Sequence, residues 1–164
     1  MADGGASTMI LLVTSLLLSG GASVVLLQSW GEVAQISEEN ASGRVANAET
    51  EVSFSGDRGD ILLDRSGANH QITLYFQNSG VRSLDKSSFS IFVDGTSSPS
   101  VGPVTLYPAN GIWASDHVLK VIVSDPSFNY SDGDFAIVTI VVQSTVSDGV
   151  RGTDSETARV RLSV

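Results

Sequence analysis

The sequence predicts an N-terminal hydrophobic helix followed by an all-β domain, an immunoglobulin-like antiparallel β-sandwich. Two observations carry this prediction. No charged residue occurs between Asp3 and Glu32, and the apolar stretch there is long enough for a continuous helix. After residue 50 the chain changes to short β-branched or alternating runs separated by turn residues. We therefore expect three parts: residues 1–39 as the helix, 40–50 as a linker and 51–164 as the β-sandwich.

The apolar centre of the helix, Met9–Leu27, has a length suited to a membrane. Its residues would extend over about 28 Å as a helix, close to the hydrocarbon thickness of a bilayer. Trp30 follows, at a position suited to the headgroup level. The side chains expected in the membrane or in a helical core are Met9, Leu12, Leu16, Leu18, Leu27 and Trp30.

A cleaved secretory signal is the main alternative. It needs a basic segment before a shorter apolar region, whereas the first basic residue here is Arg44. An uncut helix is therefore favoured. The positive-inside rule gives no orientation, because neither flank carries Lys or Arg. Two sequons, which make Asn40 and Asn129 candidate N-glycosylation acceptors, favour a domain outside the cell membrane.

One side of the helix carries small residues. Ser15, Ser19 and Ser23 recur every four residues, beside Gly20 and Gly21. Small residues at this spacing let a second helix approach closely, so this face is predicted to pack against another helix. The alternative is that membrane helices simply tolerate these residues.

The region after residue 50 reads as a series of strands. Gly, Asp, Asn, Ser and Pro fill the intervals between them, as in Asp94-Gly95. The run 136–142 is apolar on both faces, which suits a central strand or one buried against a partner. The predicted strands are Glu51–Phe54, Ile61–Leu63, Gln71–Gln77, Phe89–Val93, Val104–Tyr107, Val118–Val123, Phe135–Val142 and Thr157–Val164.

The charge composition indicates which kinds of molecule the chain can bind. Eighteen acids face nine basic residues, and the net charge is −9. Such a chain repels phosphate backbones, so no nucleic-acid partner is expected. The excess of Asp and the presence of only Lys86 and Lys120 favour a halophilic source over an ordinary acidic extracellular protein.

No motif indicates catalysis, a cofactor or a metal. Cysteine is absent, and His70 and His117 stand far apart without ligand-spaced partners. His70 is expected in a solvated turn, Gly67-Ala68-Asn69, before a strand. The acids Asp132 and Asp134 are better explained as a polar turn than as a calcium site, because the further ligands of a calcium loop are missing. We expect a non-enzymatic protein.

The whole layout resembles a known family. The uncharged start Gly4-Gly5-Ala6-Ser7-Thr8 runs into Met9–Leu27, and later segments repeat a strand-and-turn progression. These are Ile72-Thr73-Leu74-Tyr75-Phe76-Gln77-Asn78-Ser79-Gly80, Ser88-Phe89-Ser90-Ile91-Phe92-Val93-Asp94-Gly95, and Trp113 ahead of Val118-Leu119-Lys120-Val121. With these segments the chain resembles the accessory archaellum proteins of the F and G types, with the G type favoured. The acidic, lysine-poor composition suits a haloarchaeon.

The resemblance implies a role in the stator of the archaeal swimming motor. The helix would be a single membrane pass or an assembly element, and the β-sandwich would lie outside the cytoplasmic membrane. Implied partners are the other F- or G-type protein, the surface layer or the archaellum filament, in a homo- or hetero-oligomer. The absence of a basic residue before the glycines departs from the pattern of processed archaellins, which argues against a major filament subunit. Two alternatives remain: a pilin-like filament subunit, and a membrane-anchored extracellular binding module.

Overall fold

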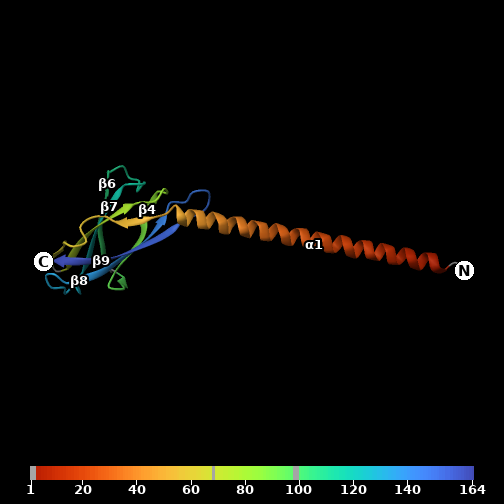
Figure 1. Ribbon diagram of the computed structural model, residues 1–164, viewed down its shortest axis with the longest axis horizontal. Coiled ribbons are helices and arrows are strands. Elements are labelled where there is room, and N and C mark those ends of the chain that lie inside the picture. The colour runs from red at the N-terminus through yellow and green to blue at the C-terminus, as the bar shows by residue number, and fades with distance from the viewer. Residues whose placement is uncertain (1–2, 68, 98–99) are drawn as a thin grey trace. The chain divides into compact units, whose positions relative to one another are not determined.

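A computed structural model describes residues 3–67, 69–97 and 100–164. The chain divides into two compact units, residues 1–42 and residues 43–164. The first is helical and the second is built mainly of strands, as the ribbon shows (Figure 1). The predicted combination of an N-terminal apolar helix and a β-sandwich is confirmed.

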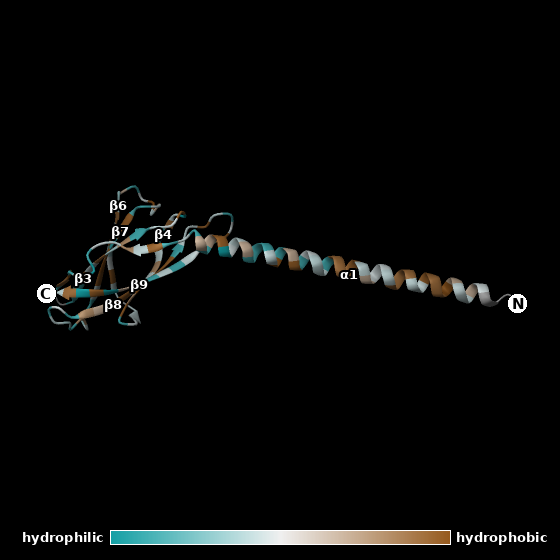
Figure 2. Cartoon of the chain, in the orientation of Figure 1, coloured by the Kyte–Doolittle hydropathy of each residue, from teal (hydrophilic) through white to brown (hydrophobic). Residues whose placement is uncertain are grey.

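Helix α1 extends from Asp3 to Ala48. Its hydropathy changes along its length, from strongly apolar turns in the N-terminal half to more polar turns beyond them (Figure 2). Between Met9 and Ile36 its large apolar side chains lie on all sides and are exposed. Such a surface is stable only when lipid or other helices cover it.

The helix continues beyond Glu39, which corrects the expected linker at residues 40–50. Asn40 lies inside the helix, and its side-chain amide donates to the Ile36 carbonyl 2.8 Å away. Ala46 is fully buried among residues of the second unit. Tertiary packing of the last turn thus outweighs the local stop signal of Asn40-Ala41-Ser42-Gly43.

The strands of the second unit pair into one continuous curled sheet whose two halves enclose the core. The strand order is β5-β4-β8-β9-β2-β3-β7-β6, with β1 paired to β3. The strands are β1 (Val52–Phe54), β2 (Ile61–Asp64), β3 (His70–Asn78), β4 (Leu84–Val93), β5 (Thr96–Ser97), β6 (Ser100–Tyr107), β7 (Val118–Asp125), β8 (Phe135–Ser144) and β9 (Thr153–Ser163).

All these pairs are antiparallel except one. β2 runs parallel to β9, with Ile61 beside Leu162, and this short pairing connects the two halves of the sheet. The sheet is therefore mixed, which corrects the purely antiparallel expectation. The sequence pattern does not predict the two-residue strand β5, because a run of two residues carries no periodicity.

The core lies between the two halves. Alternate residues of the long strands supply it, and Ile72, Leu74 and Phe76 of β3 are at most 1% exposed. Trp113, also fully buried, donates its indole N–H to the His117 carbonyl over 3.0 Å. This satisfies the one polar atom that burial of a tryptophan side chain would otherwise leave unpaired.

Strand β8 holds a central position between β4 and β9. Its residues alternate: Val138 and Ile140 are buried, whereas Phe135 and Ile137 are about half exposed, at 52% and 50%. The expectation of a central strand is confirmed. The apolar run nevertheless leaves one of its faces open to solvent.

The Asp94-Gly95 hairpin between β4 and β5 places both residues at positive φ, 48° and 78°. This is the backbone of a two-residue hairpin that follows the strand twist, and Asp and Gly tolerate it. The Asp94 carboxylate also accepts hydrogen bonds from the Ile137 amide at 2.7 Å and the Tyr130 hydroxyl at 2.6 Å.

The hydrogen bond from Tyr130 to Asp94 leads us to expect that the stability of the fold depends on pH. Partial burial, and then the Asp94 carboxylate, raise the pKa of Tyr130 well above its ordinary value. A raised pKa in the folded state stabilises the fold fully below the ordinary tyrosine pKa of about 10, and this contribution is lost as the pH rises above it. We expect stability against urea to fall above that pH. A Tyr130→Phe variant should lose less stability over the same range, and identical profiles would contradict the assignment.

Candidate functional site

The predicted helix residues all lie on an open surface. The exposed fraction is 60–73% for the apolar side chains expected in a membrane or helical core: Met9, Leu12, Leu16, Leu18, Leu27 and Trp30. In the described part of the chain, α1 is the one helix long and apolar enough to cross a membrane. It is compatible with a single membrane anchor.

The small-residue face is present on the same helix. The Ser15 hydroxyl donates to the Leu12 carbonyl and the Ser23 hydroxyl to the Ser19 carbonyl, at 3.0 and 2.9 Å. Their polar atoms are thus satisfied within the helix, which lowers the cost of placing them in an apolar setting. A Cβ built at Gly20 or Gly21 would meet no atom, so the backbone there is open to a neighbour. The role of this face in packing stays a prediction.

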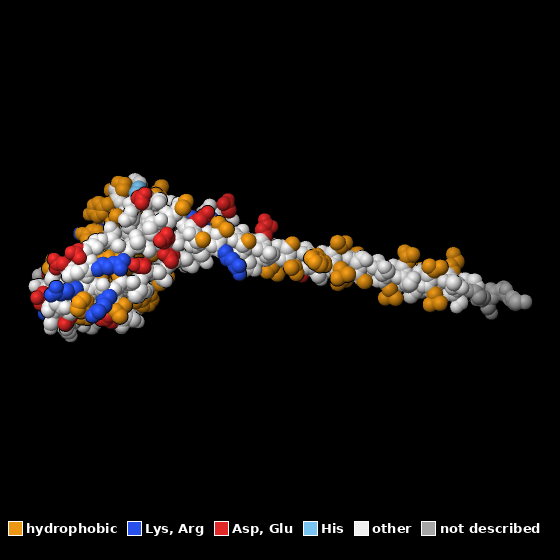
Figure 3. Space-filling view, in the orientation of Figure 1, with side chains coloured by type: hydrophobic (Ala, Val, Ile, Leu, Met, Phe, Trp, Pro, Cys, Tyr) orange, Lys and Arg blue, Asp and Glu red, His pale blue; other side chains and the backbone are white. Residues whose placement is uncertain are grey.

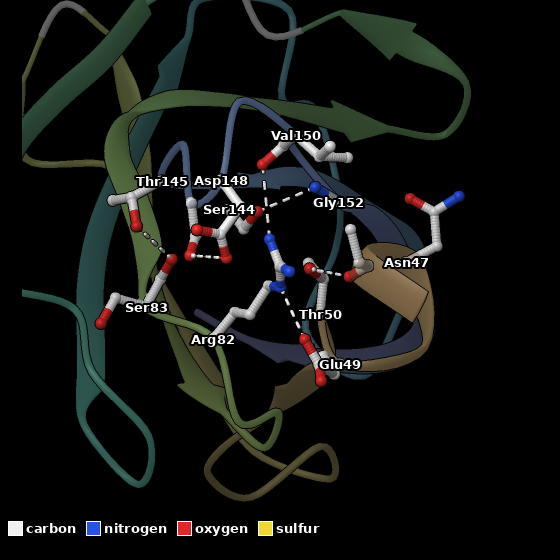
Figure 4. A network of polar contacts seen from close by, with 12 residues as sticks. Asn47, Glu49, Thr50, Arg82, Ser83, Ser144, Thr145, Asp148, Val150 and Gly152 are labelled. Atoms are coloured by element: carbon white, nitrogen blue, oxygen red, sulfur yellow. Dashed lines mark hydrogen bonds and ion pairs between the residues drawn. The ribbon is translucent and has the colours of Figure 1, made fainter. Parts of the chain in front are cut away.

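A second candidate site is the polar network around the end of α1 (Figure 4). We call it the helix-end clasp and define it by Ala46, Glu49, Thr50, Arg82 and Gly152. These residues come from the last turn of α1 and the two residues after it, from the segment before β4 and from the segment before β9, and all belong to the second unit. Long-range side-chain and backbone contacts join the three segments.

Arg82 is the central cation of the clasp. Its Nε lies 2.7 Å from a Glu49 carboxylate oxygen, and one of its terminal nitrogens donates to the Val150 carbonyl over 3.3 Å. The Arg82 side chain is only 16% exposed. Backbone hydrogen bonds join the same two segments, because the amides of Val81 and Arg82 both donate to the Glu49 carbonyl. The segment before β4 therefore holds residue 49 by both its backbone and its side chain.

Two glycines let the backbones approach at the clasp. A Cβ at Gly152 would overlap the Ala46 carbonyl oxygen and the Thr50 hydroxyl, and a Cβ at Gly80 would lie 2.5 Å from the Glu49 carbonyl. The Thr50 hydroxyl donates to the Ala46 carbonyl at 2.7 Å, which satisfies one of the carbonyls that a helix end leaves unpaired. The glycines are required by close approach rather than by a turn.

A further bond fastens each side of the clasp. The Asn47 side chain accepts from the Thr153 amide, and the Asp154 carboxylate accepts from the Val52 amide, both at 2.9 Å. Strand β9 therefore contacts the chain immediately before and after residues 49–50. The sequence alone did not indicate these residues, since their only local signals were isolated glycines and one of nine basic residues.

The two histidines occupy separate structural positions. His70 is the first residue of β3 and half-buried, and its Nδ1 lies 2.6 Å from the Phe128 carbonyl. The expected solvated turn is therefore wrong for His70, and Ala68 of that turn lies outside the described residues. His117 bonds instead through Nδ1 to the Ile112 carbonyl at 2.9 Å, ahead of β7.

The carboxylates of the acidic turn before β8 accept hydrogen bonds from backbone amides. Asp134 accepts from the Ser131 amide at 2.6 Å, and Asp132 accepts from the Val164 amide at 3.2 Å. Over residues 3–67, 69–97 and 100–164, no group of three metal-ligating side chains is placed to hold an ion.

The candidate glycosylation residues differ in setting. Asn40 lies within α1, with its amide nitrogen bonded to the helix backbone. Asn129 lies in an exposed loop between β7 and β8.

A comparison with protein families shows which family the chain belongs to. The archaeal-type flagellin family matches residues 2–156, nearly the whole chain. The chain belongs to the archaeal-type flagellin family. A comparison with curated proteins finds no match.

Membership in the archaeal-type flagellin family makes the chain a structural component of the archaellum and implies association with other archaellum proteins. The matched residues include the exposed helix and the clasp together. The expected relation to archaellum proteins is therefore confirmed at the level of the family.

Proposed function

We propose that this archaeal-type flagellin is a non-catalytic accessory component of the archaellum, of the F/G type with the G type favoured, from a haloarchaeon. Its helix anchors the chain or assembles with other helices. Its β domain acts outside the cytoplasmic membrane, in the stator, against a partner F- or G-type protein, the surface layer or the filament.

The observation that carries this proposal is the exposed apolar surface of α1. Its side chains from Met9 to Leu27 are open over a length that matches a bilayer. A surface of this size must be covered by lipid or by other helices in the working protein. The clasp then supports a mechanical role, because Glu49, the residue directly after the helix, is held to the segment before β4 by an ion pair and by backbone bonds.

The second candidate function is a filament subunit. The small-residue face of α1 favours it, because helices that pack closely could form the core of a filament. The two functions place the chain in different fractions of the cell.

Cell fractionation separates them. Filaments are sheared from cells that produce the tagged full-length chain, and both the filaments and the membranes are probed. An accessory protein should remain with the membranes while its deletion impairs swimming. Recovery of the chain as a main constituent of sheared filaments would overturn the accessory role in favour of the subunit. Normal swimming without the chain would argue against both.

The side of the membrane has its own test. Because the chain lacks cysteine, an introduced Thr105→Cys gives one labelling position on the exposed strand β6. A membrane-impermeant maleimide should label this variant in intact cells. Labelling only after lysis would place the domain inside.

Helix packing makes a further prediction. Ser19→Leu should weaken association between copies about fivefold, a loss of about 1 kcal/mol, because the larger side chain keeps two backbones apart. Membrane insertion should be unchanged. Thr14→Leu is the matched control, since its hydroxyl also bonds within the helix but lies off the serine face. Equal association of both variants, measured by energy transfer between labelled chains in membranes, would exclude the packing face.

A further inference from the structure

The outer face of β8 and β9 combines apolar and cationic side chains. We call it the arginine face and define it by Phe135, Ile137, Val141, Arg159 and Arg161. The strand register places Phe135 opposite Arg161 and Ile137 opposite Arg159, so these side chains share one side of the sheet. The three apolar residues are 37–52% exposed. Arginine or lysine side chains lie beside hydrophobic ones where β8 and β9 reach the surface (Figure 3).

The charge of this face is opposite to that of the chain. The chain has a net charge of −9, yet both arginines of the face are exposed and, in the described part of the chain, neither forms an ion pair. The Arg159 guanidinium lies over the Phe135 ring, 3.9 Å from its centre, so a cation–π contact joins the two side chains. The neighbouring acids are engaged by other groups: Asp94 by Tyr130 and Ile137, and Asp132 and Asp134, which flank Gly133 beside Arg161, by backbone amides. The face is therefore suited to an acidic and partly apolar partner.

Residues 30–39 of α1 have the complementary character. The side chains of Trp30, Val33 and Ile36 are 72%, 62% and 57% exposed. With about 100° per residue they fall on one side of the helix, and Glu32 and Glu39 border that side next to Ile36. Apolar residues bordered by carboxylates thus match apolar residues bordered by arginines.

The arginine face is long enough to cover residues 30–39 of the helix. Phe135 to Val141 extends over about 20 Å of strand, and residues 30–39 extend over about 14 Å of helix. The helical segment directly follows the apolar stretch Met9–Leu27, so a membrane or helical core that covers this stretch would leave residues 30–39 outside it.

We propose that the arginine face of one copy binds residues 30–39 of a second copy of this chain. The proposal rests on the proposed function in one respect, the association of several copies through α1. Arginine suits the contact because its planar guanidinium pairs with a carboxylate through two hydrogen bonds. Each copy carries both surfaces, so the contact repeats from copy to copy.

Cysteine cross-linking tests the geometry, since the chain has no cysteine of its own. Thr157 lies on the outer face opposite Thr139, and Ser37 lies on the same side of the helix as Trp30 and Val33. Full-length Thr157→Cys and Ser37→Cys chains are co-produced, and membranes are treated with a short bis-maleimide. A cross-linked heterodimer is expected, and it can form only between copies.

The control moves one cysteine to the other half of the sheet. Thr105→Cys is exposed on β6 and should give about tenfold less heterodimer with Ser37→Cys, as expected for a contact confined to the arginine face. Equal yields from Thr105→Cys and Thr157→Cys would overturn the proposal. No heterodimer from Thr157→Cys would do so as well.

Charge exchange tests the chemistry. Arg159→Glu with Arg161→Glu should reduce the heterodimer about tenfold, and Glu32→Arg with Glu39→Arg in the second chain should restore it. A reduction without restoration would mean that another acidic surface occupies the face, and the proposal would fail.

One further variant separates this contact from the proposed function. Ser19→Cys places the label within the small-residue face of the helix, and its homodimer reports helix association alone. If it cross-links while the Thr157–Ser37 pair does not, the helices assemble and only the docking proposal is wrong. If neither cross-links, association of copies fails too.

Discussion

An Ile140→Asp variant is expected to lose the folded β domain. Ile140 is fully buried in the central strand β8, where it faces the core. A carboxylate there would have no partner, and its burial costs several kcal/mol. Domains are commonly stable by about 5–15 kcal/mol, so this one change removes a large share of that stability. Limited proteolysis of the full-length chain in detergent should show rapid loss of the domain.

The matched control lies three residues away on the same strand. Ile137→Asp introduces the same charge at a side chain that is 50% exposed on the outer face. Its domain should remain resistant to protease. Equal resistance of both variants would mean that the two faces of β8 have been assigned wrongly.

Gly152→Ala is expected to release the helix-end clasp. The added Cβ would overlap the Ala46 carbonyl and the Thr50 hydroxyl, and Gly152 is buried between segments that cannot separate without breaking other bonds. Overpacking of this kind typically costs about 1–3 kcal/mol, and backbone neighbours place this site at the upper end. Amide hydrogen exchange should rise at Glu49 and Thr50, whose amides bond to the last helical turn.

Gly43→Ala is the control for this effect. Gly43 lies in the helical part of the second unit, and a Cβ there would meet no atom. Alanine at this position should keep or raise helix stability, by up to about 1 kcal/mol. If Gly152→Ala left exchange at Glu49 and Thr50 unchanged, the close approach would have no role in holding the helix end.

Local patterns in the sequence were sufficient for most elements. The charge-free stretch after Asp3 predicted the helix because a long apolar run has few other stable forms. Alternation in Ile72-Thr73-Leu74-Tyr75-Phe76 predicted β3 and its buried face because side chains on a strand alternate between two sides. Asp94-Gly95 predicted the hairpin because few residues accept its backbone angles.

The clasp could not be predicted in the same way. Arg82 and Glu49 are 33 residues apart, and Gly152 meets Ala46 across more than 100 residues. No local spacing signals such contacts, because they depend on how the strands are ordered. The helix end was misplaced for the same reason: Asn40 and Gly43 favour a stop locally, but burial of Ala46 extends the helix.

An apolar helix and a β-sandwich follow from the residues alone, since hydrophobic periodicity and turn chemistry act over a few neighbouring residues. The end of the helix, the parallel strand pair and the open face of β8 depend instead on tertiary contacts. So does the position of Arg159 and Arg161 beside Phe135 and Ile137 on that face. These features depend on contacts between distant segments, whose free energy appears only when the strands are packed together.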